Sequence, residues 1–390
     1  MSAPAVRLAV VVSHPIQYYA PWFAWLHRHG WTLHVFYLCD TGVAPRRDPE
    51  FGRDVVWDID LLAGYAHEFV PNAARDPGPH HFRGLDNPDL PARLRSWNPD
   101  AVLVFGYNYK THIRLIWSPP APLVFRGDSH LLDRPRPPLF KRWLLGRLFA
   151  QFTAITYVGL ANRDYFRAYR VPEARLFHAP HCVDADRFTR APEQLARADA
   201  LRAELDLRDR RIVLFAGKFI AKKQPLALLS AFLDINRADA ALVFVGDGEQ
   251  LPALRALAAT RPDLPVRFLP FANQSEMPSR YLLADIFALP SRGPGETWGL
   301  AVNEAMHLGV PCLVSNRVGC QRDLVTEGET GWVFPADSSH GLCAALSRAL
   351  DADLTALRSN LSNRIAGHTY AAAAAGLAAA LQAGQKTSSA

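Results

Sequence analysis

Short apolar stretches alternate with amphipathic segments along most of the chain. Apolar runs predict buried strands, as from Arg7 to Val12 and from Arg211 to Ala216. Segments between such runs, for example Trp22 to Leu26, place apolar residues at helical spacing. Strands that alternate with helices predict parallel sheets covered on both faces. The other expected strands are Thr32 to Leu38, Ala101 to Phe105, Leu123 to Phe125, Ala154 to Tyr157, Arg175 to Ala179, Ala241 to Gly246, Val266 to Leu269, Ile286 to Pro290, Cys312 to Val314 and Trp332 to Phe334.

The alternation stops once and then restarts. A polar, helix-prone stretch covers residues 186–210, and the strand pattern resumes directly after it. We therefore predict an α/β protein with two Rossmann-like, doubly wound domains at 1–185 and 211–367, joined by a linker at 186–210. Outside this pattern, residues 39–87 predict long loops with short elements, and 385–390 predict a frayed tail.

Composition supports two globular domains. Of 390 residues, 49% are hydrophobic and 21% charged, and this length favours two cores over one. Five scattered cysteines form no C-x-x-C pair, and no His cluster has metal spacing, so we predict no metal site, no disulfide framework and a reducing cytoplasm. The run from Leu8 to Val12 is too short for a signal peptide or a membrane span, as is every other apolar run. The net charge of +6 is compatible with an anionic partner.

Two carboxylates mark the stretch PSRGPGETWGLAVNEAMHLGVP, from Pro290 to Pro311. Glycines keep Glu296 in a loop, whereas Glu304 falls inside a short apolar helix. If that helix begins near Gly299, its free N–H groups favour phosphate oxygens. One carboxylate would then hold sugar hydroxyls and the other ribose hydroxyls. The alternative is a strand, a loop and a helix that carry two solvated glutamates. The residues expected to bind these phosphate and sugar groups are Glu296, Thr297, Trp298, Gly299, Leu300 and Glu304.

This stretch, with the apolar strand and Pro-Ser before it, resembles the retaining nucleotide-sugar glycosyltransferases of family 4, which carry E-x-[FW]-G-[LI]-x-x-x-E-A-M-x-x-G-x-P. The resemblance implies the GT-B architecture, with a cleft between two Rossmann-like domains and a C-terminal helix, 368–384, that crosses back to the first domain. It also implies a retaining transfer. The chain departs from the family at His181-Cys182, where Asn-Gly is usual. In the first loop, His14-Pro15-Ile16-Gln17 replaces paired glycines, so we expect His14 and Gln17 to contact the acceptor.

The stretch LFAGKFIAKKQ, from Leu214 to Gln224, is a candidate diphosphate site. Gly217 ends a strand, and Lys218 and Lys223 match positions at which the family carries basic residues. Lysines at a strand end and at the next helix start suit a diphosphate, although solvated lysines are the alternative. They and the helix start near Glu296 would stabilise the leaving diphosphate without a metal, and no D-x-D motif suggests a Mg²⁺ site. We therefore expect a metal-independent enzyme without a cofactor.

Other candidate site residues follow predicted strands. Phe271 comes after the strand from Val266 to Leu269; in the family this segment lines the nucleobase, and a core aromatic is the alternative. His130 matches a site histidine of many family members, and Asp128 is expected to orient His130 or an acceptor hydroxyl, unless both only cap a helix. Tyr107 is a further acceptor candidate. The expected catalytic set is His130, Lys218, Lys223 and Glu296.

Residues 134–152 combine five cations with aromatic and aliphatic side chains and predict a basic amphipathic helix. Such a helix can lie on an anionic membrane, or it can be a crossover helix packed on the sheet. Nucleic acid is not an expected partner, because no recognition motif accompanies the charge.

Together these features favour a cytoplasmic glycosyltransferase, either free in the cytoplasm or peripheral to the inner membrane. Its donor would be a nucleotide sugar, with UDP or GDP favoured, and its acceptor a glycan or lipid-linked glycan of the cell surface. The alternatives are an epimerase or a phosphorylase on the same scaffold, and a nucleotide-sugar-binding subunit without activity.

Overall fold

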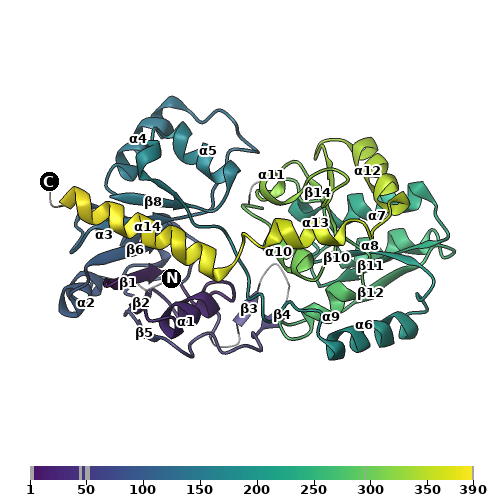
Figure 1. Cartoon of the computed structure of the whole chain (residues 1–390), viewed down its shortest axis with the longest axis horizontal. Coiled ribbons are helices and arrows are strands. Elements are labelled where there is room, and N and C mark those ends of the chain that lie inside the picture. The colour runs from purple at the N-terminus through teal and green to yellow at the C-terminus, as the bar shows by residue number, and fades with distance from the viewer. Residues whose placement is uncertain (1–3, 44–45, 49–52, 294, 389–390) are drawn as a thin grey trace. The chain divides into compact units, whose positions relative to one another are not determined.

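The computed structural model describes residues 4–43, 46–48, 53–293 and 295–388. The chain divides into two compact units, each with its own parallel sheet (Figure 1). Unit 1 comprises Met1–Arg46, Ile59–His181 and Tyr370–Ala390, and unit 2 comprises Arg47–Asp58 and Cys182–Thr369. The prediction of an α/β protein with two Rossmann-like domains is therefore confirmed.

Unit 1 contains a seven-stranded parallel sheet of order β5-β2-β1-β6-β7-β8-β9. Its strands are β1 (Arg7–Val12), β2 (Thr32–Tyr37), β5 (Ala66–Phe69), β6 (Ala101–Phe105), β7 (Leu123–Arg126), β8 (Ala154–Tyr157) and β9 (Leu176–His178). Its helices are α1 (Ala20–Arg28), α2 (Leu90–Trp97), α3 (Lys110–Trp117), α4 (Leu139–Phe149), α5 (Leu160–Ala168) and α14 (Tyr370–Ser388), with short 3-10 helices η1 (Phe82–Gly84) and η2 (Glu173–Arg175). Because β1 pairs with both β2 and β6, the strand order reverses there, and in doubly wound sheets the carboxyl ends of the strands at such a point are the usual place for a ligand.

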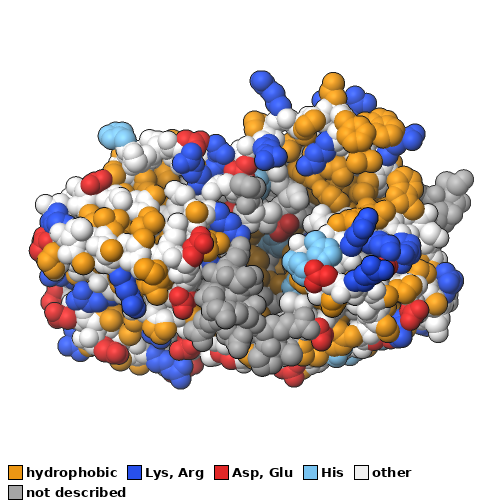
Figure 2. Space-filling model, turned by 180° about the vertical axis from the view of Figure 1, so that it is seen from behind, with side chains coloured by type: hydrophobic (Ala, Val, Ile, Leu, Met, Phe, Trp, Pro, Cys, Tyr) orange, Lys and Arg blue, Asp and Glu red, His pale blue; other side chains and the backbone are white. Residues whose placement is uncertain are grey.

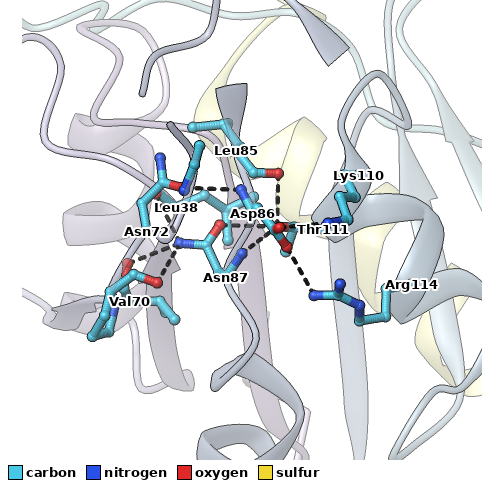
Figure 3. A network of polar contacts seen from close by, with 11 residues as sticks. Leu38, Val70, Asn72, Leu85, Asp86, Asn87, Lys110, Thr111 and Arg114 are labelled. Atoms are coloured by element: carbon cyan, nitrogen blue, oxygen red, sulfur yellow. Dashed lines mark hydrogen bonds and ion pairs between the residues drawn. The ribbon is translucent and has the colours of Figure 1, made fainter. Parts of the chain in front are cut away.

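A buried asparagine fixes the long segment between β2 and α2 (Figure 3). The Nδ2 group of Asn87 donates to the carbonyls of Leu38 and Val70 at 3.0 and 2.9 Å, and Thr111 donates to Asn87 Oδ1 at 2.9 Å. Since buried carbonyls need donors, this side chain joins the ends of β2 and β5 to α3. Besides β5 and η1, the segment predicted as long loops with short elements contains the strands β3 (Arg46–Asp48) and β4 (Arg53–Val55), which form a two-stranded sheet.

Unit 2 contains a six-stranded parallel sheet of order β12-β11-β10-β13-β14-β15. Its strands are β10 (Arg211–Ala216), β11 (Ala240–Val245), β12 (Val266–Leu269), β13 (Ile286–Leu289), β14 (Cys312–Ser315) and β15 (Gly331–Phe334). Its helices are α6 (Pro192–Glu204), η3 (Ala221–Lys223), α7 (Pro225–Ile235), α8 (Leu251–Ala259), α9 (Met277–Leu282), α10 (Leu300–His307), α11 (Gln321–Leu324), α12 (Ser339–Asp351) and α13 (Arg358–Ile365).

The stretch predicted as a linker is an integral part of unit 2. Within it, α6 packs against α9, and Arg202 donates to the Leu283 carbonyl at 2.9 Å and pairs with Asp285 at 3.0 Å. The division between the units falls instead between His181 and Cys182. The polar composition of 186–210 reflects a surface helix that buries only Ala198 and Leu201.

The C-terminal helix α14 packs on the sheet of unit 1 along β8 and β9. Its alanines and Gly376 allow a close approach, since a Cβ on Gly376 would lie 1.9 Å from the His178 carbonyl oxygen. The helix continues to Ser388, so the tail predicted to fray from Gln385 is helical up to that residue. No proline interrupts this alanine-rich sequence before Ser388.

Because a histidine of unit 1 is buried, we expect the free energy of unfolding to fall as the pH is lowered. His112 on α3 is 1% exposed, neither ring nitrogen has a hydrogen-bond partner among the described residues, and burial lowers its pKa from 6.5 to about 4. Between these values the unfolded chain binds a proton that the folded chain does not, so stability present above pH 6.5 is lost as the pH falls toward 4.

We expect His112→Leu to remove about 2 kcal/mol of this acid destabilisation. Melting curves recorded across this pH range should therefore show a smaller fall in melting temperature for His112→Leu than for the wild type. His27→Leu, which replaces an exposed histidine on α1, is the control. Equal pH dependence in His112→Leu and the wild type would contradict the assignment.

Candidate functional site

The loop after β10 carries the first predicted donor residues. Gly217 has φ 147°, a backbone conformation that favours glycine. A Cβ there would meet no atom within 4 Å, so there is open space beside the loop. A Cβ on Gly246, after the neighbouring strand β11, would lie 2.0 Å from the Gly217 carbonyl oxygen. The loops after β10 and β11 are thus in close contact, which fixes the position of the backbone next to Lys218.

Lys223 and Glu296, both predicted as catalytic residues, form an ion pair. The Lys223 ammonium donates to Glu296 Oε2, which also accepts from Ser291 Oγ at 2.7 Å. The side chains are 21% and 12% exposed, so water screens this pair only partly. A backbone hydrogen bond of 2.7 Å from Arg292 N–H to the Lys222 carbonyl joins the two loops. The structure therefore brings together Lys223, which the sequence assigned to a diphosphate, and Glu296, which it assigned to hydroxyl groups.

The turn after Glu296 is closely packed against neighbouring backbone. Gly299 has φ 95° and precedes α10, as predicted. Gly319 holds the turn, since a Cβ there would lie 1.8 Å from the Thr297 carbonyl oxygen. Trp298 is 3% exposed and its indole N–H donates to Asn303 Oδ1 at 2.8 Å, so its side chain belongs to the core. The donor contacts predicted for Thr297 to Leu300 stay predictions.

Glu304 on α10 is 2% exposed, and its Oε2 accepts a hydrogen bond of 2.6 Å from the Tyr281 hydroxyl. Tyr281, on α9, is itself 1% exposed and packs edge-on against Phe287. A buried carboxylate requires hydrogen bonds, and the tyrosine supplies one that fixes the carboxylate orientation. The sequence pattern did not reveal this partner.

Phe271 lies in the segment after β12 and is half-buried. Its ring centroid is 6.3 Å from that of Trp57, and Asn273 donates to the Val56 carbonyl at 2.6 Å. The segment that carries Trp57 therefore belongs to the surroundings of Phe271, which the sequence analysis missed because residues 39–87 show no clear periodicity. The predicted contact of Phe271 with a nucleobase stays a prediction.

The first predicted acceptor residues follow β1 and β6 in unit 1. Ser13 Oγ lies 2.9 Å from His14 Nδ1, and burial lowers the pKa of His14 to about 4, which keeps the ring neutral at physiological pH. Tyr107 shares a hydrogen bond of 2.7 Å with the Tyr165 hydroxyl, and burial raises its pKa. Gln17 is half-buried before α1. The roles of His14, Gln17 and Tyr107 toward an acceptor stay predictions.

Asp128 and His130 follow β7. The backbone N–H of Leu132 donates to His130 Nδ1 at 3.2 Å, so a neutral His130 ring carries its proton on Nε2. Asp128 lies 3.6 Å from Nε2 of His181, which is 2% exposed. Burial lowers the pKa of His181, while Asp128 acts in the opposite direction. His181, noted in the sequence only as a departure from the resembling family, thus joins the predicted site residues of unit 1.

One group of metal-ligating types occurs in the described part of the chain. Donor atoms of Asp76, His80 and His81 lie within 4.8 Å of one another, although the sequence analysis found no such cluster. His81 Nδ1 accepts from the Arg83 N–H at 3.1 Å, which leaves the proton of the neutral ring on Nε2. Since Nε2 is the nitrogen that faces Asp76, at 3.2 Å, the ring acts there as a donor rather than a metal ligand.

A family model and several curated proteins match this chain. Residues 198–367 match the family model "Glycosyl transferases group 1". A GDP-mannose-dependent alpha-(1-6)-phosphatidylinositol monomannoside mannosyltransferase of Mycolicibacterium smegmatis is 31% identical over 220 residues, 54% of this chain and 56% of that protein. A UDP-Gal:alpha-D-GlcNAc-diphosphoundecaprenol alpha-1,3-galactosyltransferase of Escherichia coli is 28% identical over 236 residues, 58% of this chain and 59% of that protein. The chain thus spans little more than half the length of these relatives.

Solved structures are similar over nearly the whole chain. A glycosyltransferase from Rickettsia africae superposes with a TM-score of 0.73 at 13% identity, covering 95% of this chain and 97% of its own. Alr3699/HepE of Anabaena in complex with UDP superposes with a TM-score of 0.70 at 15% identity. The superposition covers 98% of this chain and 100% of that chain. At these identities the similarity concerns the fold, and it confirms the predicted GT-B class.

Proposed function

Because residues 198–367 match the family model of the glycosyl transferases group 1, we propose that this chain transfers a sugar from a nucleotide-diphosphate sugar to an acceptor hydroxyl. The observation that carries the proposal is the pairing of Lys223 with Glu296 beside the turn that opens α10. A cation, a carboxylate and the N-terminal end of a helix there suit a diphosphate next to a sugar. The relatives use GDP-mannose and UDP-galactose, so a GDP- or UDP-sugar is the proposed donor.

In the proposed reaction, the diphosphate oxygens compete with Glu296 for the Lys223 ammonium. Lys218, Lys223 and the amides before α10 then stabilise the charge that grows on the leaving diphosphate, without a metal or cofactor. Glu296, released from the lysine, binds sugar hydroxyls. Retention by front-side attack would pass the acceptor proton to the leaving phosphate.

The proposed acceptor is a glycan or lipid-linked glycan. The names of the two relatives above include phosphatidylinositol monomannoside and diphosphoundecaprenol, both lipids. Within the described residues, the helices fall short of the length and apolar character that crossing a membrane requires. The five cysteines are thiols, which suits the proposed cytoplasmic location.

The test is a thermal-shift screen of the purified protein against UDP-, GDP-, ADP- and dTDP-sugars, with and without EDTA. A ligand that binds only the folded state must raise the melting temperature. We expect stabilisation by one nucleotide series, of equal size with EDTA present. Stabilisation abolished by EDTA would contradict metal independence, and no stabilisation by any of these donors would contradict the proposed function.

A further inference from the structure

Helix α4 of unit 1 is apolar on two sides, and only one of them is packed. Leu145, Leu148 and Phe149 are buried in the core of the unit. Gly146 brings the helix close to the Tyr169 carbonyl, 3.1 Å from where a Cβ would lie, and Arg142 donates to the Ala168 carbonyl at 3.2 Å. This buried side is all that a crossover helix needs to cover its sheet.

A second set of large apolar side chains on α4 points to solvent. Leu139, Phe140, Trp143 and Leu144 are 79%, 72%, 58% and 45% exposed. At 100° per residue they fall within an arc of about 140° on the side of the helix away from the buried stripe. We call these four residues the outer face of α4. In Figure 2, hydrophobic side chains bordered by Lys and Arg gather over the part of unit 1 that carries α4.

Cationic side chains flank the outer face, and the segment that carries it contains no acidic residue. Residues 134–152 contain Arg134, Arg136, Lys141, Arg142 and Arg147, and neither Asp nor Glu. The Arg147 guanidinium lies 5.2 Å from the Trp143 ring centroid, and the Phe140 and Trp143 rings stack with centroids 6.2 Å apart. The sequence predicted a basic amphipathic helix here without showing which apolar side chains are buried, and in the structure Leu148 and Phe149 point inward. The structure separates these inward residues from the exposed ones.

We propose that the outer face of α4 docks this protein on the surface of an anionic lipid bilayer. Aromatic and leucine side chains would enter the boundary between headgroups and acyl chains, while the flanking Lys and Arg contact anionic headgroups. A second copy of this chain is a poorer occupant, because a two-fold contact would place these cations against one another. The proposal does not depend on sugar transfer, since docking requires neither donor nor acceptor.

The experiment is flotation of the protein with vesicles of phosphatidylcholine alone or mixed with phosphatidylglycerol, without nucleotide sugar. We expect binding to the anionic vesicles. The variant Phe140→Ser/Trp143→Ser should bind them at least about tenfold more weakly. The affinity of the variant Arg134→Gln/Arg136→Gln/Lys141→Gln for the anionic vesicles should fall about a hundredfold. Phe82→Ser, which replaces a half-exposed aromatic on η1, should bind like the wild type.

All substituted side chains are exposed, so the melting temperatures should stay unchanged and a loss of binding can be assigned to the surface. Absence of vesicle binding by the wild type, or equal binding by the wild type and the Phe140→Ser/Trp143→Ser variant, would overturn the proposal. So would a stable dimer of the wild type that the same variant converts to a monomer, because the outer face would then be a contact between copies.

Discussion

Replacing Lys223 by glutamine is expected to lower the turnover number of sugar transfer about 100- to 1,000-fold, the loss typical of removing one group that stabilises transition-state charge. In the structure the Lys223 ammonium contacts Glu296 and is only 21% exposed. Glutamine keeps most of the side-chain length but carries no charge to offer the leaving diphosphate. Release of nucleoside diphosphate at saturating donor measures the effect.

Two controls separate catalysis from structure. Lys222→Gln removes the same charge from the neighbouring residue of η3 and should cost much less activity. The double variant Lys223→Gln/Glu296→Gln removes both partners of the ion pair and should be no more active than Lys223→Gln alone. Recovery of activity in the double variant would show that the lysine only neutralises a buried carboxylate, and would contradict its role toward the diphosphate.

The variant Glu304→Gln is expected to weaken donor binding about 10- to 100-fold, because a charged hydrogen bond to the ribose is replaced by a neutral one. Glu304 is almost fully buried, and glutamine has nearly the same volume, so packing should be retained. Calorimetric titration with the stabilising nucleotide sugar measures the dissociation constant. An unchanged dissociation constant would contradict the ribose assignment.

Tyr281→Phe is the matched variant for Glu304. It removes the hydroxyl that donates to Glu304 Oε2 at 2.6 Å and leaves the packed ring in place. If the tyrosine positions the carboxylate, donor affinity should fall by less than in Glu304→Gln, with the turnover number little changed. A fall in melting temperature without loss of donor affinity would assign Tyr281 a structural role only.

The central strands were predictable from sequence because both of their faces are buried. β10 and β11 are apolar over nearly their full lengths, so a continuous run marks each of them. β5 was missed because AHEF is only half-buried at the sheet edge and lacks such a run. Helix α6 was read as a linker for the same reason, since few of its residues are buried.

The motif residues were predictable, but their partners were not. Lys223 and Glu296 stand 73 positions apart and meet because β10 and β13 are neighbours in the sheet, so that the loops after these strands lie together. Tyr281 reaches Glu304 through the packing of α9 against α10. Such pairs depend on the strand order and helix packing, which the periodicity of one sequence does not specify.

The most direct test of the proposed transfer is to incubate the protein with its stabilising nucleotide sugar and a membrane lipid extract, and to follow both products by mass spectrometry. We expect a lipid or glycan that gains one sugar residue, an equal amount of nucleoside diphosphate, and loss of both products in Glu296→Gln. Conversion of the nucleotide sugar without an acceptor would indicate an epimerase instead. Binding of the nucleotide sugar with no product of either kind would contradict the transferase.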